Sequence, residues 1–217
     1  GSAAVVLKRS DDAERDGDRV YAVIEGCASA QSKQDSDGLA DAVHEAAAAA
    51  IAEAEADTSS IGYIELSSPG QSALAEAELL GLSAAYGDTG ENHCALGSIK
   101  THIGETFAAS GLAGLVRAAL CVSQRYIPAT PVWNGRASAS SASPFYVPAE
   151  SRPWFSEGIR RASVSGVGPD GAAFNVIVAE PSRSPAANVA ETAASGPYVI
   201  PVAGADIDEL ERGLNQL

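Results

Sequence analysis

Short apolar runs rich in β-branched residues alternate along this chain with longer alanine-rich segments. We expect strands at the apolar runs 3–8, 20–28, 61–66 and 96–100. We expect helices at 39–57, 72–85 and 107–125. Two further strands, 162–167 and 174–180, flank the turn GPDG. Alternating strands and helices that end in a hairpin predict a layered α/β domain with a mixed sheet.

The alanine-rich segment 39–57 has the spacing of an amphipathic helix. Its apolar stripe consists of Leu39, Val43, Ala47, Ile51 and Ala54. The alanine run 46–50 is interpreted as a face for close helix packing. The charged segment between the first two runs, 9–18, is interpreted as a polar turn.

The charge of the chain argues against several kinds of partner. Its 14 basic and 28 acidic residues give a net charge of −14, which repels phosphates and anionic lipid surfaces. We therefore expect no nucleic-acid binding. No membrane span and no signal peptide are apparent, which favours a cytoplasmic location.

The cysteines and histidines are too scattered to indicate a metal site. Cys27, Cys94 and Cys121 are odd in number and widely spaced, so we expect buried thiols and no disulfide framework. His44 and His93 are isolated, and no metal or directly bound cofactor is expected. Because methionine is absent throughout, we expect the chain to be part of a longer polypeptide.

Composition suggests three parts. Residues 1–180 contain the predicted α/β elements, and 181–196 read as a linker rich in Ser, Ala and Pro. Residues 197–217 are predicted to begin a following linker or domain.

Four stretches, in this order, resemble the C-terminal part of a β-ketoacyl synthase, the condensing enzyme of fatty acid and polyketide assembly. They are GSAAVVLKRSDDAERDGDRVYAVIEG, SIKTHIGETFAASGLAGLVRAAL, SPFYVPAESRPW and RRASVSGVGPDGAAFNVIVAE. The resemblance implies a thiolase-like α/β/α fold, here its C-terminal half with the last strands of the N-terminal half. The stretches RYIPATPVW and ESRPW resemble most the ketosynthase-like or chain-length-factor domains of polyunsaturated fatty acid synthases.

The family's catalytic positions are altered in this chain. The histidine motif H-G-T-G-T aligns with SSPGQ, which places Ser67 at the histidine. The second motif, K-S-N-I-G-H, reads KTHIGE, which retains Lys100 and places Glu105 at the histidine. An ionised Glu105 would repel the malonyl carboxylate and the enolate, whereas a neutral imidazole donates a hydrogen bond to them.

The gate-loop motif G-F-G-x-x-G-T-N-x-H is altered as well. It reads GVGPDGAAFN, with Val167 at the gate phenylalanine and Asn175 at the last histidine, while Gly168 and Gly171 match. The resemblance therefore implies a catalytically degenerate domain with no catalytic residues of its own. It would act as a chain-length factor or as a scaffold for an active ketosynthase or acyltransferase, or as a bare structural module.

Two catalytic alternatives stay open at this point. The chain could belong to an active condensing or decarboxylating synthase whose nucleophilic cysteine lies outside it. A hydrolytic triad of Ser67, His102 and Glu105 is disfavoured, because LSSPG lacks the G-x-S-x-G elbow. Glu105 is interpreted as a first-turn residue of a helix, and His102 as a hydrogen-bonding residue of the turn.

The resemblance also implies partners. These are a ketosynthase or the N-terminal half of the same fold, together with acyltransferase and acyl carrier protein domains. The family's substrates are phosphopantetheine thioesters of the carrier protein.

Overall fold

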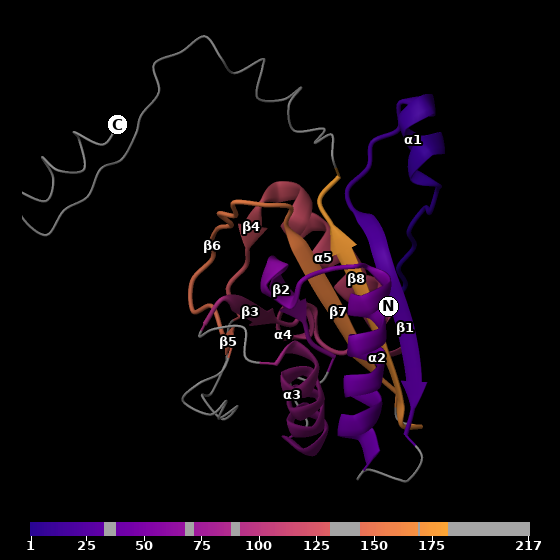
Figure 1. Ribbon diagram of the computed structural model, residues 1–217. Coiled ribbons are helices and arrows are strands. Elements are labelled where there is room, and N and C mark those ends of the chain that lie inside the picture. The colour runs from indigo at the N-terminus through magenta and orange to yellow at the C-terminus, as the bar shows by residue number, and fades with distance from the viewer. Residues whose placement is uncertain (33–37, 68–71, 88–91, 131–143, 169, 182–217) are drawn as a thin grey trace, which may run out of the picture. The chain divides into compact units, whose positions relative to one another are not determined.

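The computed structural model describes residues 1–32, 38–67, 72–87, 92–130, 144–168 and 170–181. The linker predicted at 181–196 falls almost entirely outside these residues, as does the whole of 197–217. A six-stranded sheet runs through the described part, with α2 and α3 on one face and α5 on the other (Figure 1). The α/β/α layering expected from the sequence is confirmed.

The sheet is mixed, in the order β1-β8-β7-β2-β3-β5. Its strands are β1 (Val23–Gln31), β2 (Ile61–Glu65), β3 (Cys94–Gly97), β5 (Phe145–Tyr146), β7 (Arg161–Val167) and β8 (Ala172–Ala179). β8 is antiparallel to both β1 and β7, whereas β7, β2, β3 and β5 run parallel. Two short strands, β4 (Tyr126–Ile127) and β6 (Arg152–Pro153), pair separately.

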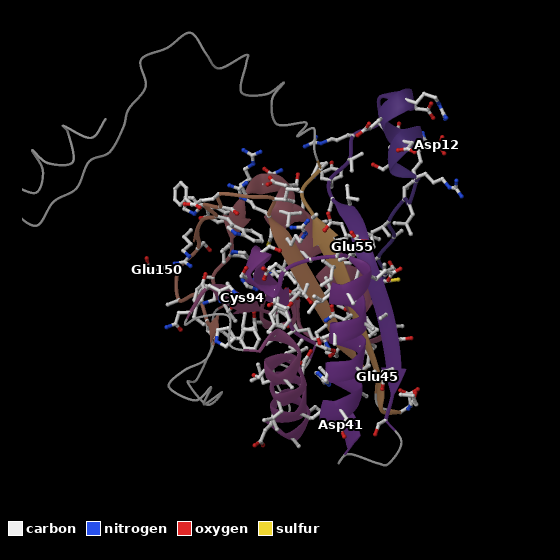
Figure 2. All side chains as sticks on the ribbon, in the orientation of Figure 1. Asp12, Asp41, Glu45, Glu55, Cys94 and Glu150 are labelled. Atoms are coloured by element: carbon white, nitrogen blue, oxygen red, sulfur yellow. The ribbon has the colours of Figure 1, made fainter. Side chains whose placement is uncertain are left out.

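Helices α2 (Leu39–Glu53) and α3 (Ser72–Tyr86) form the layer on one face of the sheet. The predicted stripe of α2 is confirmed, because Leu39, Val43, Ala47 and Ile51 are buried and Ala54 is partly buried. Asp41 and Glu45 lie on the exposed side of α2 (Figure 2). The charges of Asp41 and Glu45 are therefore directed to solvent.

Helix α5 (Ser110–Gln124) covers the opposite face and packs on β7, β2 and β8. It begins after a 3-10 turn at Phe107–Ala109 and ends at Arg125, which has a left-handed φ of 55°. Within the described residues, Phe107–Gln124 is the helical stretch with the length and apolar composition of a membrane span. Core helices of soluble proteins share that property, and α5 lies against the sheet.

The strand predicted at 3–8 is wrong. These residues pair with none of the described strands, and the side chains of Val6 and Leu7 are 96% and 72% exposed. An apolar extended run forms a strand only where a neighbouring strand supplies backbone partners. Among the described strands, β1 is paired with β8 alone.

The polar turn predicted at 9–18 is also wrong, because it contains the helix α1 (Ser10–Asp16). Asp11 and Asp12 occupy the first turn, where the helix dipole favours negative charge. Gly17 ends the helix with φ of 71°, a conformation that glycine adopts without strain. The strand predicted at 96–100 ends earlier, at Gly97, and the short helix α4 (Lys100–Ile103) follows.

Candidate functional site

The ends of β2 and β3 are joined by hydrogen bonds, which bring together the two segments that the sequence analysis aligned with the family's histidine motifs. The Leu66 amide donates to the Gly97 carbonyl at 2.7 Å, and the Ser98 hydroxyl donates to the Leu66 carbonyl at 2.9 Å. Parallel neighbours end at the same edge of a sheet, where α/β proteins place their sites. Ser67 follows one strand here, and Lys100 follows the other.

Ser67, which the sequence analysis predicted to align with the histidine of the first motif, is partly buried. Its amide donates to Glu78 Oε1 at 2.9 Å, and Glu78 on α3 is 1% exposed. Its hydroxyl accepts the Val167 amide at 3.2 Å. Ser67 therefore connects the end of β2 to the start of the gate loop.

Lys100 and Glu105 form an ion pair across α4, with 2.7 Å between Nζ and Oε2. Gly104 turns the chain between them with φ of 75°. The Lys100 ammonium holds the pKa of Glu105 below its ordinary value. A weaker contribution in the same direction comes from the Phe107 amide, which donates to Oε1 at 2.8 Å. The position predicted for the family's second histidine thus carries a carboxylate whose pKa is lowered.

A buried polar network beneath this edge was not foreseen from the sequence. Glu65 is 2% exposed, and Oε2 accepts the Tyr63 hydroxyl at 2.6 Å while Oε1 accepts the Ile99 amide. Arg117 Nε lies 3.7 Å from Glu65 Oε2. Burial raises the pKa of Glu65, against the effect of these donors. A single acidic residue in the apolar run IGYIEL and a single arginine in apolar α5 were the available signals.

His102 contacts this network from α4. Its Nδ1 lies 3.0 Å from Thr101 Oγ1 and 3.3 Å from Arg117 Nη1. Because a guanidinium only donates, Nδ1 is the acceptor in the contact with Arg117. No hydrogen bond among the described residues joins Ser67, His102 and Glu105, so the structure does not assemble the triad considered above.

The positions predicted to form the gate loop lie at or near the turn between β7 and β8. Val167 is the last residue of β7, and its amide bonds to Ser67 as described. The Gly168 amide donates to the Ala172 carbonyl at 2.7 Å, and Gly171 has φ of 80°. Asn175 is buried, and its Oδ1 accepts the Ser163 hydroxyl at 3.0 Å. The structure brings Val167 to Ser67, but it pairs Asn175 with a neighbouring strand residue.

The cysteines offer no reactive thiolate at this edge. Cys94 and Cys121 are buried as expected, and burial raises the pKa of both, that of Cys121 to about 12. The expectation for Cys27 is wrong, because it is exposed on β1, the strand at the end of the sheet order. Within the described ranges, no three His, Cys, Asp or Glu side chains gather as metal ligands would.

Sequence comparison identifies relatives of this chain. The family model for the β-ketoacyl synthase C-terminal domain matches residues 21–133. Two different subunits of the phenolphthiocerol/phthiocerol polyketide synthase of Mycobacterium tuberculosis are similar to the chain, one 39% identical over 211 residues and the other 38% identical over 195 residues. These matches cover 92% and 84% of the chain but only 11% and 12% of the relatives.

Solved structures of ketosynthases are also similar to this chain. The ketosynthase from module 6 of the bacillaene synthase of Bacillus subtilis 168 is 28% identical, with a TM-score of 0.72, over 80% of this chain and 33% of that one. The module 1 ketosynthase of Bacillus amyloliquefaciens FZB42 has the same fold, with a TM-score of 0.74 at 24% identity, over 97% of this chain and 37% of that one. The chain belongs to the β-ketoacyl synthase family and carries the C-terminal domain of that family.

Proposed function

We propose that this chain is the C-terminal part of a catalytically degenerate ketosynthase domain in a multidomain polyketide synthase. Its relatives in Mycobacterium tuberculosis are components of a polyketide synthase. In this proposal the domain is a chain-length factor or a scaffold for an active ketosynthase or acyltransferase. The acyl chains that it meets are phosphopantetheine thioesters of an acyl carrier protein.

The Lys100–Glu105 ion pair carries the proposal. Decarboxylative condensation needs a neutral hydrogen-bond donor beside the malonyl carboxylate and the developing enolate. Glu105 instead presents a negative charge, and the Lys100 ammonium is already paired with it at 2.7 Å. Ser67, at the other histidine position, has its amide and hydroxyl bonded to Glu78 and Val167. Neither position supplies the acid/base group that the reaction requires.

An apolar groove supports the proposed partner, the preceding half of the same fold. The groove has a volume of about 850 Å³ and lies between residues 4–10, residues 18–24 and one face of α5. Val116 and Leu120 on that face are 38% and 43% exposed, and Val6 is almost fully exposed. The solved ketosynthases are about three times as long as the part matched here, which provides a segment to cover this surface.

The test is carbon dioxide release from malonyl carrier protein by the full-length polypeptide that contains this chain. We expect no release above the protein-free rate, and a change in product length when the polypeptide is combined with an active ketosynthase. Release of carbon dioxide would contradict the degenerate assignment and favour an active condensing enzyme.

A matched pair of variants isolates the role of charge. Glu105→Gln keeps the shape but removes the charge, which we expect to strengthen binding of a malonyl thioester about fivefold, or roughly 1 kcal/mol after solvent screening. Ser67→Ala removes a hydroxyl and no charge, so binding should stay unchanged. Equal effects from both variants would show that repulsion by Glu105 is not the cause.

A further inference from the structure

The imidazole of His102 lies between two groups that make opposite demands on it. Its Nδ1 lies 3.0 Å from Thr101 Oγ1 and 3.3 Å from Arg117 Nη1. The Thr101 hydroxyl donates its single hydrogen to the Ser98 carbonyl at 2.7 Å, so its oxygen is left to accept from His102. The Arg117 guanidinium can only donate. The Nδ1 atom therefore faces an acceptor on one side and a donor on the other.

Protonation decides which of the two contacts forms. An unprotonated Nδ1 accepts from Arg117, whereas a protonated Nδ1 donates to Thr101. In the imidazolium both ring nitrogens carry hydrogen, so no acceptor is left for the guanidinium and the two positive charges repel each other. Imidazole is the side chain that ordinarily changes its charge between about pH 5 and 8. His102 is exposed, so a proton reaches the ring directly from solvent.

Arg117 keeps its other partners when the contact with His102 is lost. Its side chain is 7% exposed, Nη2 donates to the Ala129 carbonyl at 3.4 Å, and Nε lies 3.7 Å from Glu65 Oε2. Glu65 accepts hydrogen bonds from the Tyr63 hydroxyl and from the backbone in turn. The buried pair of Arg117 and Glu65 therefore stays in place, and the change is confined to the α4 side of the contact.

Helix α4 is the element that responds. It has four residues, none of them buried, and Gly104 ends it with φ of 75°. A helix this short gains little stability from its own hydrogen bonds, so contacts outside it determine how firmly it is held. The His102 side chain joins it to Arg117 on α5, and Lys100 on the same helix is paired with Glu105 at the candidate site. Loss of the contact with Arg117 loosens the helix that carries Lys100.

We propose that His102 is a pH-sensitive switch, which fastens α4 to α5 when Nδ1 is unprotonated and releases α4 when the ring becomes positively charged. The inference rests on these contacts and does not depend on the proposed function. The alignment expected with K-S-N-I-G-H places an asparagine of the family at this position. An asparagine carries a donor and an acceptor in one amide, so it can bond to Thr101 and Arg117 at once and does not titrate.

The other ionisable groups around His102 behave differently as the pH falls. Lys100 and Glu105 form an ion pair in which the pKa of Glu105 is lowered, so this carboxylate keeps its charge near neutral pH. Burial raises the pKa of Glu65 and that of Tyr63. Since a raised pKa brings Glu65 closer to neutral pH, a test has to separate its proton uptake from that of His102.

Hydrogen exchange of the full-length polypeptide, measured by mass spectrometry, tests the switch. The readout is the peptide that covers residues 98–104, compared at about pH 8 and about pH 6 after correction for the intrinsic effect of pH on exchange. We expect exchange to be about threefold faster at the lower pH, the size expected for the loss of one hydrogen bond. His44→Asn, at an exposed position of α2, is the matched control and should keep this difference.

Two variants lock the switch in opposite positions. His102→Asn should give the slower exchange at both pH values, because its amide bonds to Arg117 without titrating. His102→Lys carries a positive charge throughout and offers no acceptor. It should exchange about threefold faster than the parent at the higher pH and show no further change at the lower one.

Two results would overturn the inference. Equal exchange of the parent peptide at both pH values would show that α4 does not respond to protonation. A pH difference that persists in His102→Asn would assign the response to another group, such as Glu65, which that variant retains. Neither result bears on the proposed function, which the assay of carbon dioxide release tests separately.

Discussion

Glu105 carries a negative charge at the candidate site. It is 45% exposed, so water screens much of its charge, yet its carboxylate is held by both Lys100 and the Phe107 amide. Its pKa is lowered, so the pair stabilises the fold above the ordinary pKa of 4.5, and this contribution is lost as the pH falls through the folded value.

Replacing Lys100 tests whether its ammonium is the main cause of the lowered pKa of Glu105. In Lys100→Met the pKa of Glu105 should rise towards 4.5, because its largest stabilising partner is gone. Carbon-detected NMR titration of the Glu105 carboxylate measures the midpoint. Lys8→Met removes a different ion pair, to Asp16 and Asp18, and should leave the midpoint where it is. An unchanged midpoint in Lys100→Met would contradict the assignment.

At the scale of elements, small residues allow the layers to approach closely. Ala46, Ala47 and Ala50 of α2 are at most 1% exposed. A Cβ atom at Gly81 of α3 would overlap the Ala40 carbonyl of α2 and lie 2.7 Å from the Val43 Cβ. The two helices are thus held at a separation that the sequence of each determines.

Gly81→Ala separates packing from helix propensity. Propensity alone predicts stabilisation by about 1 kcal/mol. The close approach to α2 predicts the opposite, destabilisation by about 1–3 kcal/mol. Urea unfolding measures the sign of the change in the free energy of unfolding. Ser83→Ala, at an exposed position of the same helix, should change the free energy of unfolding by less than about 0.5 kcal/mol.

The sequence predicted the central elements well, because their patterns are local. The stripe of α2 and the hairpin of β7 and β8 follow from spacing within each segment. The segment 3–8 could not be predicted in the same way, because strand formation depends on a neighbour elsewhere in the fold. At the site, the positions of Ser67 and Glu105 followed from the family resemblance. Their partners Glu78, Val167 and Lys100 depend on contacts that spacing does not reveal.

At the scale of the molecule, the exposed apolar face of α5 and the unpaired run at 3–8 lie on one groove. Leu120 on α5 and Leu80 on α3 are both exposed leucines, at 43% and 59%, but only Leu120 lines this groove. They form a matched pair for testing what covers it.

We expect Leu120→Asp to lower the melting temperature of the full-length polypeptide and Leu80→Asp to leave it unchanged. An aspartate buried under the preceding half would lose its hydration, whereas one on α3 would keep it. In the isolated chain both variants should melt like the parent, because both positions are exposed there. Equal melting temperatures of the two variants in the full-length polypeptide would mean that the rest of that polypeptide does not cover the groove.

The exposed strand β1 has one further property. The Cys27 amide donates to Glu53 Oε2 on α2 at 2.8 Å, so a carboxylate occupies a backbone donor of the strand at the end of the sheet order. A strand from another molecule would have to displace that carboxylate in order to add to this edge. We therefore expect Glu53 to oppose the addition of a foreign strand at this edge.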